Sequence, residues 1–181
     1  MKVLLCISGG IATYKICEVI SLLKKEAANI EFKTIMTKNA TRFVTPLTFE
    51  ALTNSEVSCS TFDDPMHHIS WAKWCDICCI APLTANTLAK IALGLCDDML
   101  TTTVCAIPNT TPVLFCPAMN TEMWNKKTIQ KNVQILEDLG YTQVAPTEKL
   151  LACGDYGVGA LAEPNDIVQQ VKTAKKKEQS T

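Results

Sequence analysis

The chain opens with VLLCISGG, residues 3–10: five apolar residues followed by a serine and two glycines. A short apolar run that ends at glycines is typical of a strand buried on both faces of a parallel sheet. From Ile11 the apolar period changes to that of a helix. The residues on its apolar face are Ile16, Val19, Ile20 and Leu23. The start of the chain therefore predicts a strand, a tight turn and a helix, in that order.

The same alternation of strand-like and helix-like patterns continues along the chain. Further apolar runs of strand length lie at 32–36, 76–81, 113–116 and 141–144. Helical patterns occupy 46–52, 85–93, 99–106, 126–139 and 165–175. This rhythm predicts an α/β fold of the Rossmann-like (flavodoxin-like) kind, an open parallel sheet with helices on both faces.

The length of 181 residues fits a single domain, which we place at 1–171. Within it, residues 145–163 match neither pattern and are long for an irregular connection, so we expect a flexible, functional loop there. The only basic cluster of the chain is Lys172, Lys175, Lys176 and Lys177. We expect 172–181 to be a basic disordered tail.

The composition excludes several classes of protein. The chain is 48% hydrophobic and 19% charged, which excludes an intrinsically disordered protein. Lys and Arg number 17 against 18 Asp and Glu, so the basic excess of a nucleic-acid-binding protein is missing. No apolar run approaches the ~20 residues of a membrane-spanning helix, and the N-terminal run is too short for a signal peptide. We expect a cytoplasmic protein that binds neither nucleic acid nor membrane.

The ten cysteines predict neither disulfides nor a metal site. Several lie inside apolar runs, where a free thiol behaves as a small hydrophobic side chain. These are Cys6, Cys78, Cys79, Cys105 and Cys116. Cys75 and Cys78 have the spacing of zinc ligands, but no second pair of Cys or His follows at the usual distance. We expect no bound metal.

Ligands of open α/β sheets bind beyond the carboxyl ends of the strands. The turn Ser8-Gly9-Gly10 there could bring backbone N–H groups to a phosphate, or it could be a plain tight turn. It lacks the pattern G-x-G-x-x-G, and the P-loop pattern is absent from the chain, which disfavours NAD and a P-loop nucleotide. The segment Thr84 to Thr87 could cap a helix or also meet the polar edge of a flat ring such as a flavin.

Two further segments carry candidate acid–base groups. His67 and His68, the only histidines, lie in a predicted loop, and histidine is the side chain best suited to accept a proton near neutral pH. Cys153 lies in a glycine-rich, lid-like segment where a thiol could approach a ligand.

Four segments together resemble one family, the homo-oligomeric flavin-containing cysteine decarboxylases. They are Ser8 to Lys15 (SGGIATYK), His68-Ile69-Ser70 with Trp74-Cys75-Asp76, Pro82 to Thr87 (PLTANT) and Pro117 to Trp124 (PAMNTEMW). The last matches the family pattern P-x-M-N-x-x-M-W, which is highly specific. Residues 152–157 (ACGDYG) resemble the substrate clamp of one branch, the phosphopantothenoylcysteine decarboxylases. Trp71 and Cys75 depart from the residues expected there, which are aliphatic and alanine.

The resemblance implies FMN-dependent conversion of 4'-phospho-N-pantothenoylcysteine to 4'-phosphopantetheine, a step in coenzyme A synthesis. It implies that His68 is the base, that Asn120, supported by Met123, holds the substrate carboxylate, and that Cys153 is the acid. Lys73 is the candidate contact for the substrate phosphate. The expected FMN-binding residues are Ser8, Gly9, Gly10, Ile11, Thr37, Asn39, Thr84, Ala85, Asn86, Thr87 and Met119. We also expect a homotrimer, or a larger assembly of trimers, whose subunits share the active site.

The implied chemistry follows from the instability of a carbanion formed by direct loss of carbon dioxide. Oxidation of the cysteine CH2–SH to a thioaldehyde gives the departing electrons an acceptor, and an enethiolate results. FMN supplies the two-electron oxidation and the later reduction. Three alternatives remain: a peptidyl-cysteine decarboxylase that stops at the enethiol, a flavin prenyltransferase of similar fold, and a non-catalytic flavin-binding regulatory subunit. Cys153 argues against the first, and His68 with Asn120 against the second. Regulatory subunits of this kind tend to carry long acidic tails, which the chain lacks.

Overall fold

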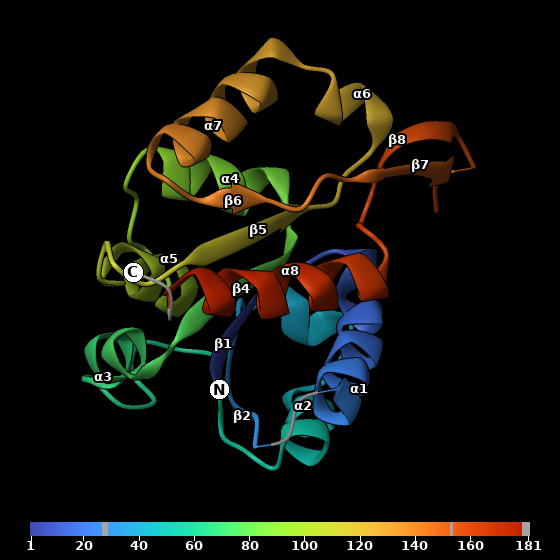
Figure 1. Cartoon of the computed structure of the whole chain (residues 1–181). Coiled ribbons are helices and arrows are strands. Elements are labelled where there is room, and N and C mark those ends of the chain that lie inside the picture. Colours follow the sequence, from blue (N-terminus) through green and yellow to red (C-terminus); the bar gives the residue numbers. More distant parts are fainter. Residues whose placement is uncertain (27–28, 153, 179–181) are drawn as a thin grey trace.

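The computed structural model describes residues 1–26, 29–152 and 154–178. Its centre is a six-stranded parallel sheet (Figure 1). The strands are β1 (Lys2–Ile7), β2 (Glu31–Met36), β3 (Val57–Ser58), β4 (Ile77–Leu83), β5 (Val113–Pro117) and β6 (Thr142–Gln143). Their order, β3-β2-β1-β4-β5-β6, is that of Rossmann folds and not the order of flavodoxin. The predicted α/β class and parallel sheet are confirmed, and β3 is a strand that the sequence pattern did not indicate.

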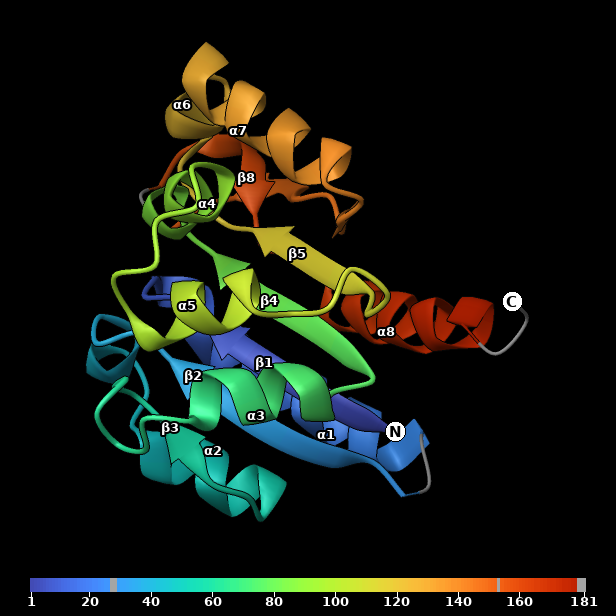
Figure 2. The same cartoon turned by 90° about the vertical axis from the view of Figure 1, so that its left-hand side faces the viewer.

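Helices cover both faces of the sheet. The helical elements are η1 (Ile11–Lys15), α1 (Ile16–Glu26), η2 (Ala40–Arg42), α2 (Pro46–Thr53), α3 (His67–Trp74), α4 (Ala85–Ala92), α5 (Met99–Cys105), α6 (Thr121–Trp124), α7 (Lys127–Asp138) and α8 (Pro164–Glu178). Helices α1, α2 and α8 contribute to one hydrophobic core, and α3, α4, α5 and α7 to the other. In Figure 2, α3 and α5 lie in front of the sheet.

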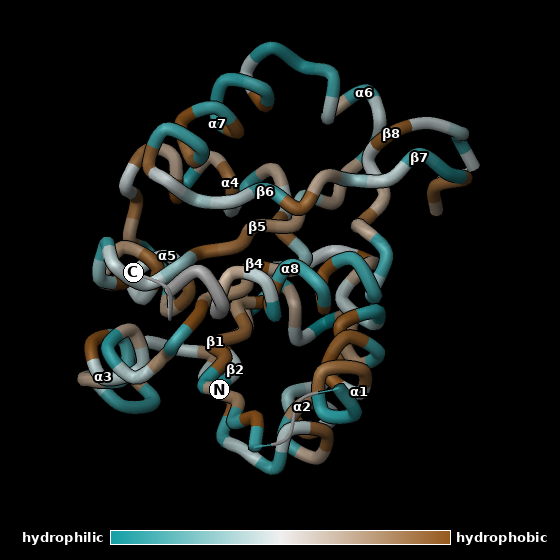
Figure 3. The backbone as a smooth tube through the Cα atoms, viewed as in Figure 1, coloured by the Kyte–Doolittle hydropathy of each residue, from teal (hydrophilic) through white to brown (hydrophobic). Residues whose placement is uncertain are grey.

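Strand β1 is buried on both faces, which explains why the opening run of the sequence is apolar at every position. Val3, Leu5 and Ile7 belong to the core on the side of α1, whereas Leu4 and Cys6 belong to the core on the opposite side. Because successive side chains of a strand point to opposite faces, a strand covered on both sides needs apolar residues at every position. Figure 3 shows the central strands as mostly hydrophobic.

Residues 145–163 are more regular than the predicted flexible loop. They contain an antiparallel hairpin of β7 (Thr147–Leu150) and β8 (Tyr156–Ala160), which lies beside α6 (Figure 1). A Cβ at Gly157 would lie 2.6 Å from Thr121 Oγ1, and one at Gly159 would lie 2.3 Å from the Met119 carbonyl oxygen. These two glycines therefore allow β8 to pack closely against Thr121 and Met119. Because β7 and β8 are regular strands, the expectation of an irregular segment is wrong for both of them.

Three other expectations are corrected. His67 and His68 begin helix α3 and do not lie in a loop. Residues 172–178 continue α8, so the predicted disordered tail is wrong as far as Glu178, and Lys172 forms an ion pair with Glu26. Cys105 is exposed at the end of α5 and is not a core residue. Among the described residues, no helix is long and apolar enough to cross a membrane.

Candidate active site

The side chain of Ser8 joins the carboxyl ends of β1 and β4. Its hydroxyl donates to the Pro82 carbonyl at 2.7 Å and accepts the backbone N–H of Thr84 at 2.8 Å. The residue is fully buried. Ser8 therefore positions the turns that follow β1 and β4, and its hydroxyl is engaged within the protein.

The two glycines of the turn after β1 have different surroundings. A Cβ at Gly9 would lie 2.5 Å from the Asn39 Cβ and 2.8 Å from the Ala40 nitrogen, so glycine here lets two turns touch. Gly10 has an extended backbone, with φ of −152°, and its Cβ would meet only Thr84 Cγ2, at an ordinary 3.4 Å. Neither the backbone conformation nor the packing of the protein requires glycine at position 10. The space beside Gly10 is therefore open to a ligand.

A cavity of about 510 Å³ opens between the turns that follow β1, β2 and β4. We call it the amide cavity, because Asn39 and Asn86 line it. Most residues predicted to bind the cofactor meet there: Gly9, Thr37, Asn39, Thr84, Ala85, Asn86, Thr87 and Met119, together with Met123. The sequence analysis did not single out five other residues that line this cavity, which are Lys38, Lys90, Asp97, Asp98 and Ala118.

The polar groups of the amide cavity are only partly used by the protein. Thr84 caps α4, since its hydroxyl oxygen accepts the Thr87 N–H, and it lies 3.3 Å from the Thr87 hydroxyl. The helix-cap interpretation is therefore confirmed. Within the part of the chain that the structure describes, the side-chain amides of Asn39 and Asn86 make no hydrogen bond. These two amides can bind a ligand with several donors and acceptors on its edge.

A second cavity, of about 480 Å³, lies between η1 and the hairpin, and we call it the hairpin cavity. Gly10, Ile11, Met119 and Asn120 of the predicted site line it. Ala118 and Met119 line both cavities, so the two spaces adjoin along this short segment. The backbone N–H of Ala118 donates to Leu83 at 3.0 Å, and that of Met119 donates to Gly159 at 2.8 Å. The shared wall is thus held by both the sheet and the hairpin.

Two lysines that the sequence analysis missed, Lys15 and Lys149, line the hairpin cavity. Lys149 forms an ion pair with Glu163, which raises the pKa of Lys149 and lowers the pKa of Glu163. Burial lowers the pKa of Lys15, and the neighbouring Lys149 lowers it further. Two carboxylates, Glu163 and Glu18, act on Lys15, and Glu163 also pairs with Lys149. The two ammonium groups side by side can still bind an anion such as a phosphate. Lys15 ends the segment Ser8 to Lys15, so the sequence could have indicated it as a candidate. Lys149 reaches the cavity only because it lies on β7 of the hairpin, which the sequence did not predict.

Asn120 has an orientation set by the helix that it caps. Its Oδ1 accepts the backbone N–H of Glu122 at 2.8 Å and that of Met123 at 3.4 Å. The amide nitrogen therefore points away from α6, and it donates to Asp155 Oδ2 at 3.4 Å. A side-chain N–H held in this way is suited to a carboxylate.

Three described residues of the predicted site, Ser8, His68 and Lys73, line neither cavity. His68 and Lys73 lie on α3, and neither lines the amide cavity or the hairpin cavity. Cys153 lies outside the described residues, between two described neighbours, Ala152 and Gly154. The neighbouring His67 stacks on Trp71 with ring centroids 4.5 Å apart, which fixes the start of α3. Within one chain, the base predicted from the resemblance is thus separate from the pocket that holds Asn120.

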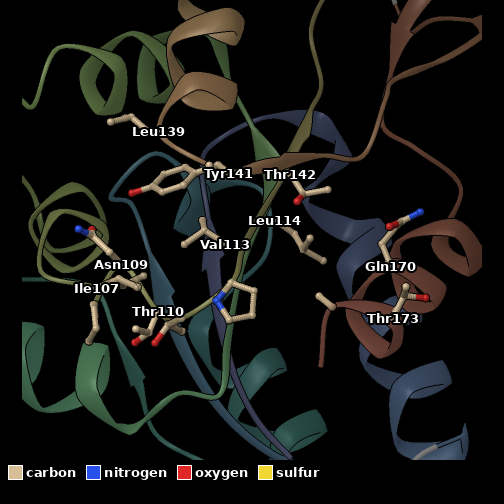
Figure 4. Close-up of a pocket in the computed structure, with 15 residues that line it drawn as sticks. Ile107, Asn109, Thr110, Val113, Leu114, Leu139, Tyr141, Thr142, Gln170 and Thr173 are labelled. Carbon is tan, nitrogen blue, oxygen red and sulfur yellow. The ribbon is translucent and has the colours of Figure 1, made fainter. Parts of the chain in front are cut away.

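A third cavity, of about 530 Å³, lies at the amino ends of β5 and β6. Figure 4 shows Tyr141 and Asn109 on one side of it and Gln170 and Thr173 on the other. Its lining has no charged side chain, and burial raises the pKa of Tyr141 to about 12. Ligands of this sheet type bind at the opposite ends of the strands, so we do not place the active site here.

Comparison with known proteins identifies the family. Residues 1–175 match the family model described as Flavoprotein. The chain belongs to the Flavoprotein family. A "Probable phosphopantothenoylcysteine decarboxylase" of Streptococcus mutans is 38% identical over 175 residues, covering 94% of this chain and 97% of that protein. In Bacillus subtilis, the "Coenzyme A biosynthesis bifunctional protein CoaBC" is 46% identical over 172 residues. The match covers 93% of this chain but only 41% of that longer protein.

Solved structures agree with this membership. A "PPC decarboxylase mutant" complexed with pantothenoylaminoethenethiol has a TM-score of 0.84 at 38% identity, covering 95% of this chain and 96% of the other. "The FMN binding protein AtHal3" has a TM-score of 0.80, also at 38% identity, covering 95% of each chain. The resemblance inferred from the four sequence segments is confirmed at the level of family and fold.

The amide cavity fits the flavin of such a flavoprotein. The open space beside Gly10, which lines the adjoining hairpin cavity, would admit a phosphate or sugar close to the backbone. The two amides at Asn39 and Asn86 would face polar atoms of a flat ring, with Thr84 and Met119 beside them. These residues would hold the cofactor next to the wall that separates it from the hairpin cavity.

Proposed function

We propose that this flavoprotein decarboxylates 4'-phospho-N-pantothenoylcysteine to 4'-phosphopantetheine in coenzyme A biosynthesis. The observation that carries the proposal is the hairpin cavity. It offers the amide of Asn120 for a carboxylate and the ammonium groups of Lys15 and Lys149 for a phosphate. The substrate carries both groups, and the relatives described above act in the same chemistry.

FMN is the proposed cofactor, held in the amide cavity by the predicted residues that line it. The flavin-binding character of the family and the FMN-binding neighbour support this choice. When bound, FMN would supply a two-electron acceptor for the cysteine CH2–SH group. The chain's own residues then have three tasks: to hold the carboxylate and phosphate, to remove a proton from the substrate and to return one later.

Asn120 and Met123 form the proposed carboxylate site. Asn120 would donate its amide N–H to a carboxylate oxygen, and the cap on α6 keeps that N–H directed outward. The proposed phosphate site consists of Lys15 and Lys149. The sequence favours Lys73 for this role, but Lys73 lies exposed on α3 and outside the cavity, so a contact from it needs a second subunit.

His68 is the proposed base, and its position supports a shared active site in a homotrimer. His68 lines neither cavity of its own chain, so it would act on substrate held by a neighbouring subunit. Large apolar side chains are exposed in the segments that follow strands β1 and β3, which supports burial of this region between subunits. Examples are Ile11 at 58%, Phe62 at 93% and Met66 at 60% exposure.

Cys153 is the proposed acid of the last step. It would protonate the enethiolate carbon as reducing equivalents return, because a thiol of pKa ~8.5 is a far better acid than a hydroxyl. Its described neighbours Ala152 and Gly154 lie at the tip of the hairpin, and Ala152 lines the hairpin cavity. We also propose a cytoplasmic location, because that compartment keeps thiols reduced and buried thiols such as those of Cys6 and Cys78 lie within the central strands.

Turnover with phosphopantothenoylcysteine, followed by mass spectrometry of the product, tests the proposal. Phosphopantetheine is the expected product, formed with loss of one carbon dioxide and no other change. A product lighter by a further two hydrogens would instead indicate an enzyme that stops at the enethiol. Unchanged substrate in the presence of bound FMN would refute the proposal and favour a non-catalytic flavin-binding protein.

A further inference from the structure

The acidic residue at the tip of the hairpin is in contact with the amide proposed to bind the substrate carboxylate. Asp155 Oδ2 lies 3.4 Å from the Asn120 amide nitrogen. Because Asn120 Oδ1 already accepts two backbone N–H groups, its amide cannot turn over without losing the α6 cap. The amide therefore keeps a fixed donor for a carboxylate, and Asp155 of the same chain offers its carboxylate to that donor.

The position of Asp155 is built into the hairpin. Its carbonyl accepts the Leu151 N–H at 2.8 Å, and the Gly154 N–H donates to Leu151 at 2.9 Å, which closes the tip. Gly154 has φ of +91°, a conformation that favours glycine. Behind the tip, β8 is fixed because Gly157 and Gly159 allow it to touch Thr121 and Met119. The contact with Asn120 follows from these backbone interactions.

We propose that Asp155 is a specificity-determining residue that competes with the substrate carboxylate for Asn120. This inference rests on the proposed function. A carboxylate ligand must displace Asp155 from the amide, and two carboxylates close together repel each other. After decarboxylation the ligand no longer has a carboxylate, so Asp155 returns to Asn120 without opposition. Competition therefore weakens binding of the carboxylate-bearing substrate and leaves binding of the product unaffected.

A matched pair of unreactive ligands separates these effects. 4'-Phosphopantothenoylserine keeps the carboxylate but replaces the oxidisable thiol with a hydroxyl, and its decarboxylated counterpart, the phosphopantothenoyl-ethanolamine amide, lacks the carboxylate. Titration of the FMN-loaded protein would give the Kd of each ligand. For Asp155→Asn we expect the Kd of the serine ligand to fall about tenfold, corresponding to one weakened like-charge contact. The Kd of the ethanolamine ligand should stay within about twofold of wild type.

Two further variants control for folding and for charge. Asp155→Ser removes the same carboxylate with a smaller side chain and should give the same selective tightening. Glu148→Gln removes one negative charge from an exposed position of β7 on the same hairpin, and it should change neither Kd. Bound FMN and the unfolding temperature of each variant show whether the protein is intact.

Each outcome discriminates between explanations. Equal tightening of both ligands would mean a general charge effect and would overturn the competition. Weaker binding of the serine ligand would mean that Asp155 assists the substrate directly and would also overturn the competition. The same holds for an unchanged Kd of the serine ligand together with a lower kcat for phosphopantothenoylcysteine. If wild-type protein binds neither ligand, the proposed function itself fails, whereas wild-type binding without a selective change in Asp155→Asn refutes only this inference.

Discussion

Replacing Gly10 by alanine should weaken FMN binding without destabilising the protein. The Cβ added by Gly10→Ala would meet only Thr84 Cγ2 at 3.4 Å, and the backbone, with φ of −152° and ψ of 164°, is allowed for any residue. An alanine at a compatible position restricts the unfolded chain and stabilises a protein by about 0.4–1 kcal/mol. The free energy of unfolding of the cofactor-free protein should therefore stay constant or rise slightly.

Replacement of Gly9 provides the matched control. A Cβ there would lie 2.5 Å from the Asn39 Cβ, 2.6 Å from the Asn39 carbonyl carbon and 2.8 Å from the Ala40 nitrogen. Backbone atoms cannot give way as a flexible side chain can, so Gly9→Ala has to separate two turns. Overpacking of this kind costs about 1–3 kcal/mol. The neighbouring glycines should thus differ in sign: Gly9→Ala lowers the free energy of unfolding, whereas Gly10→Ala does not.

The assay combines urea unfolding of the cofactor-free proteins with titration of FMN, followed by quenching of flavin fluorescence. If the space beside Gly10 receives the cofactor, the added methyl group should raise the Kd of Gly10→Ala at least tenfold, about 1.4 kcal/mol. Wild-type affinity for FMN in a stable Gly10→Ala protein would show that the space at Gly10 has no part in cofactor binding. A destabilised Gly10→Ala would contradict the packing on which the inference rests.

Three further predictions concern the groups around the substrate. His68→Asn should retain FMN but lose carbon dioxide release about 100-fold, and mixing it with Asn120→Ala should restore activity if subunits share sites; absence of rescue in mixed oligomers would contradict the sharing. Cys153→Ser should still release carbon dioxide but accumulate the enethiol product with reduced flavin under anaerobic conditions, and normal phosphopantetheine formation at an unchanged rate would remove Cys153 from the chemistry. Because burial and Lys149 depress the pKa of Lys15, its positive charge is present at low pH and disappears at a lower pH than for an ordinary lysine. The KM for the phosphorylated substrate should therefore rise as pH increases through this lowered pKa, and Lys15→Gln should abolish that rise; an identical pH profile in Lys15→Gln would exclude the assignment.

The strands and the turns after them were predictable because their signals are local. A continuous apolar run followed by glycines specifies a buried strand and a tight turn without reference to distant residues. Helix α3 lacks such signals: it begins after Met66, which makes no side-chain cap, and its first turn holds no acidic residue. Its start is instead stabilised by the stacking of His67 on Trp71. The local pattern therefore predicts a loop at 67–68. The more consequential finding is that neither residue lines the amide cavity or the hairpin cavity.

The structural roles of the glycines in the hairpin were the hardest to predict from the sequence. The glycine-rich pattern predicts flexibility at Gly157 and Gly159, yet these residues allow β8 to pack where a Cβ would strike Thr121 or Met119. Gly154, at the tip, has open space around it and a left-handed backbone. Glycine is required at 157 and 159 by atoms that lie far away in the sequence, and it is favoured at 154 by the local φ. The residue type alone reveals neither reason. The pattern over 145–163 consequently predicts an irregular segment, whereas β7 and β8 order much of its backbone.

The shared wall of the two cavities is the feature that connects fold and proposed chemistry. In the proposed reaction, the substrate carbon that bears the thiol is oxidised by a flavin, and the reacting atoms must be held in a narrow range of distance and orientation. Ala118 and Met119 border both cavities, and their N–H groups are bound to β4 on one side and to β8 on the other. A change in the hairpin is therefore transmitted through main-chain hydrogen bonds to the boundary between cofactor and substrate. This arrangement explains why glycines are needed in β8: a side chain at Gly159 would push directly on the Met119 carbonyl and move that boundary.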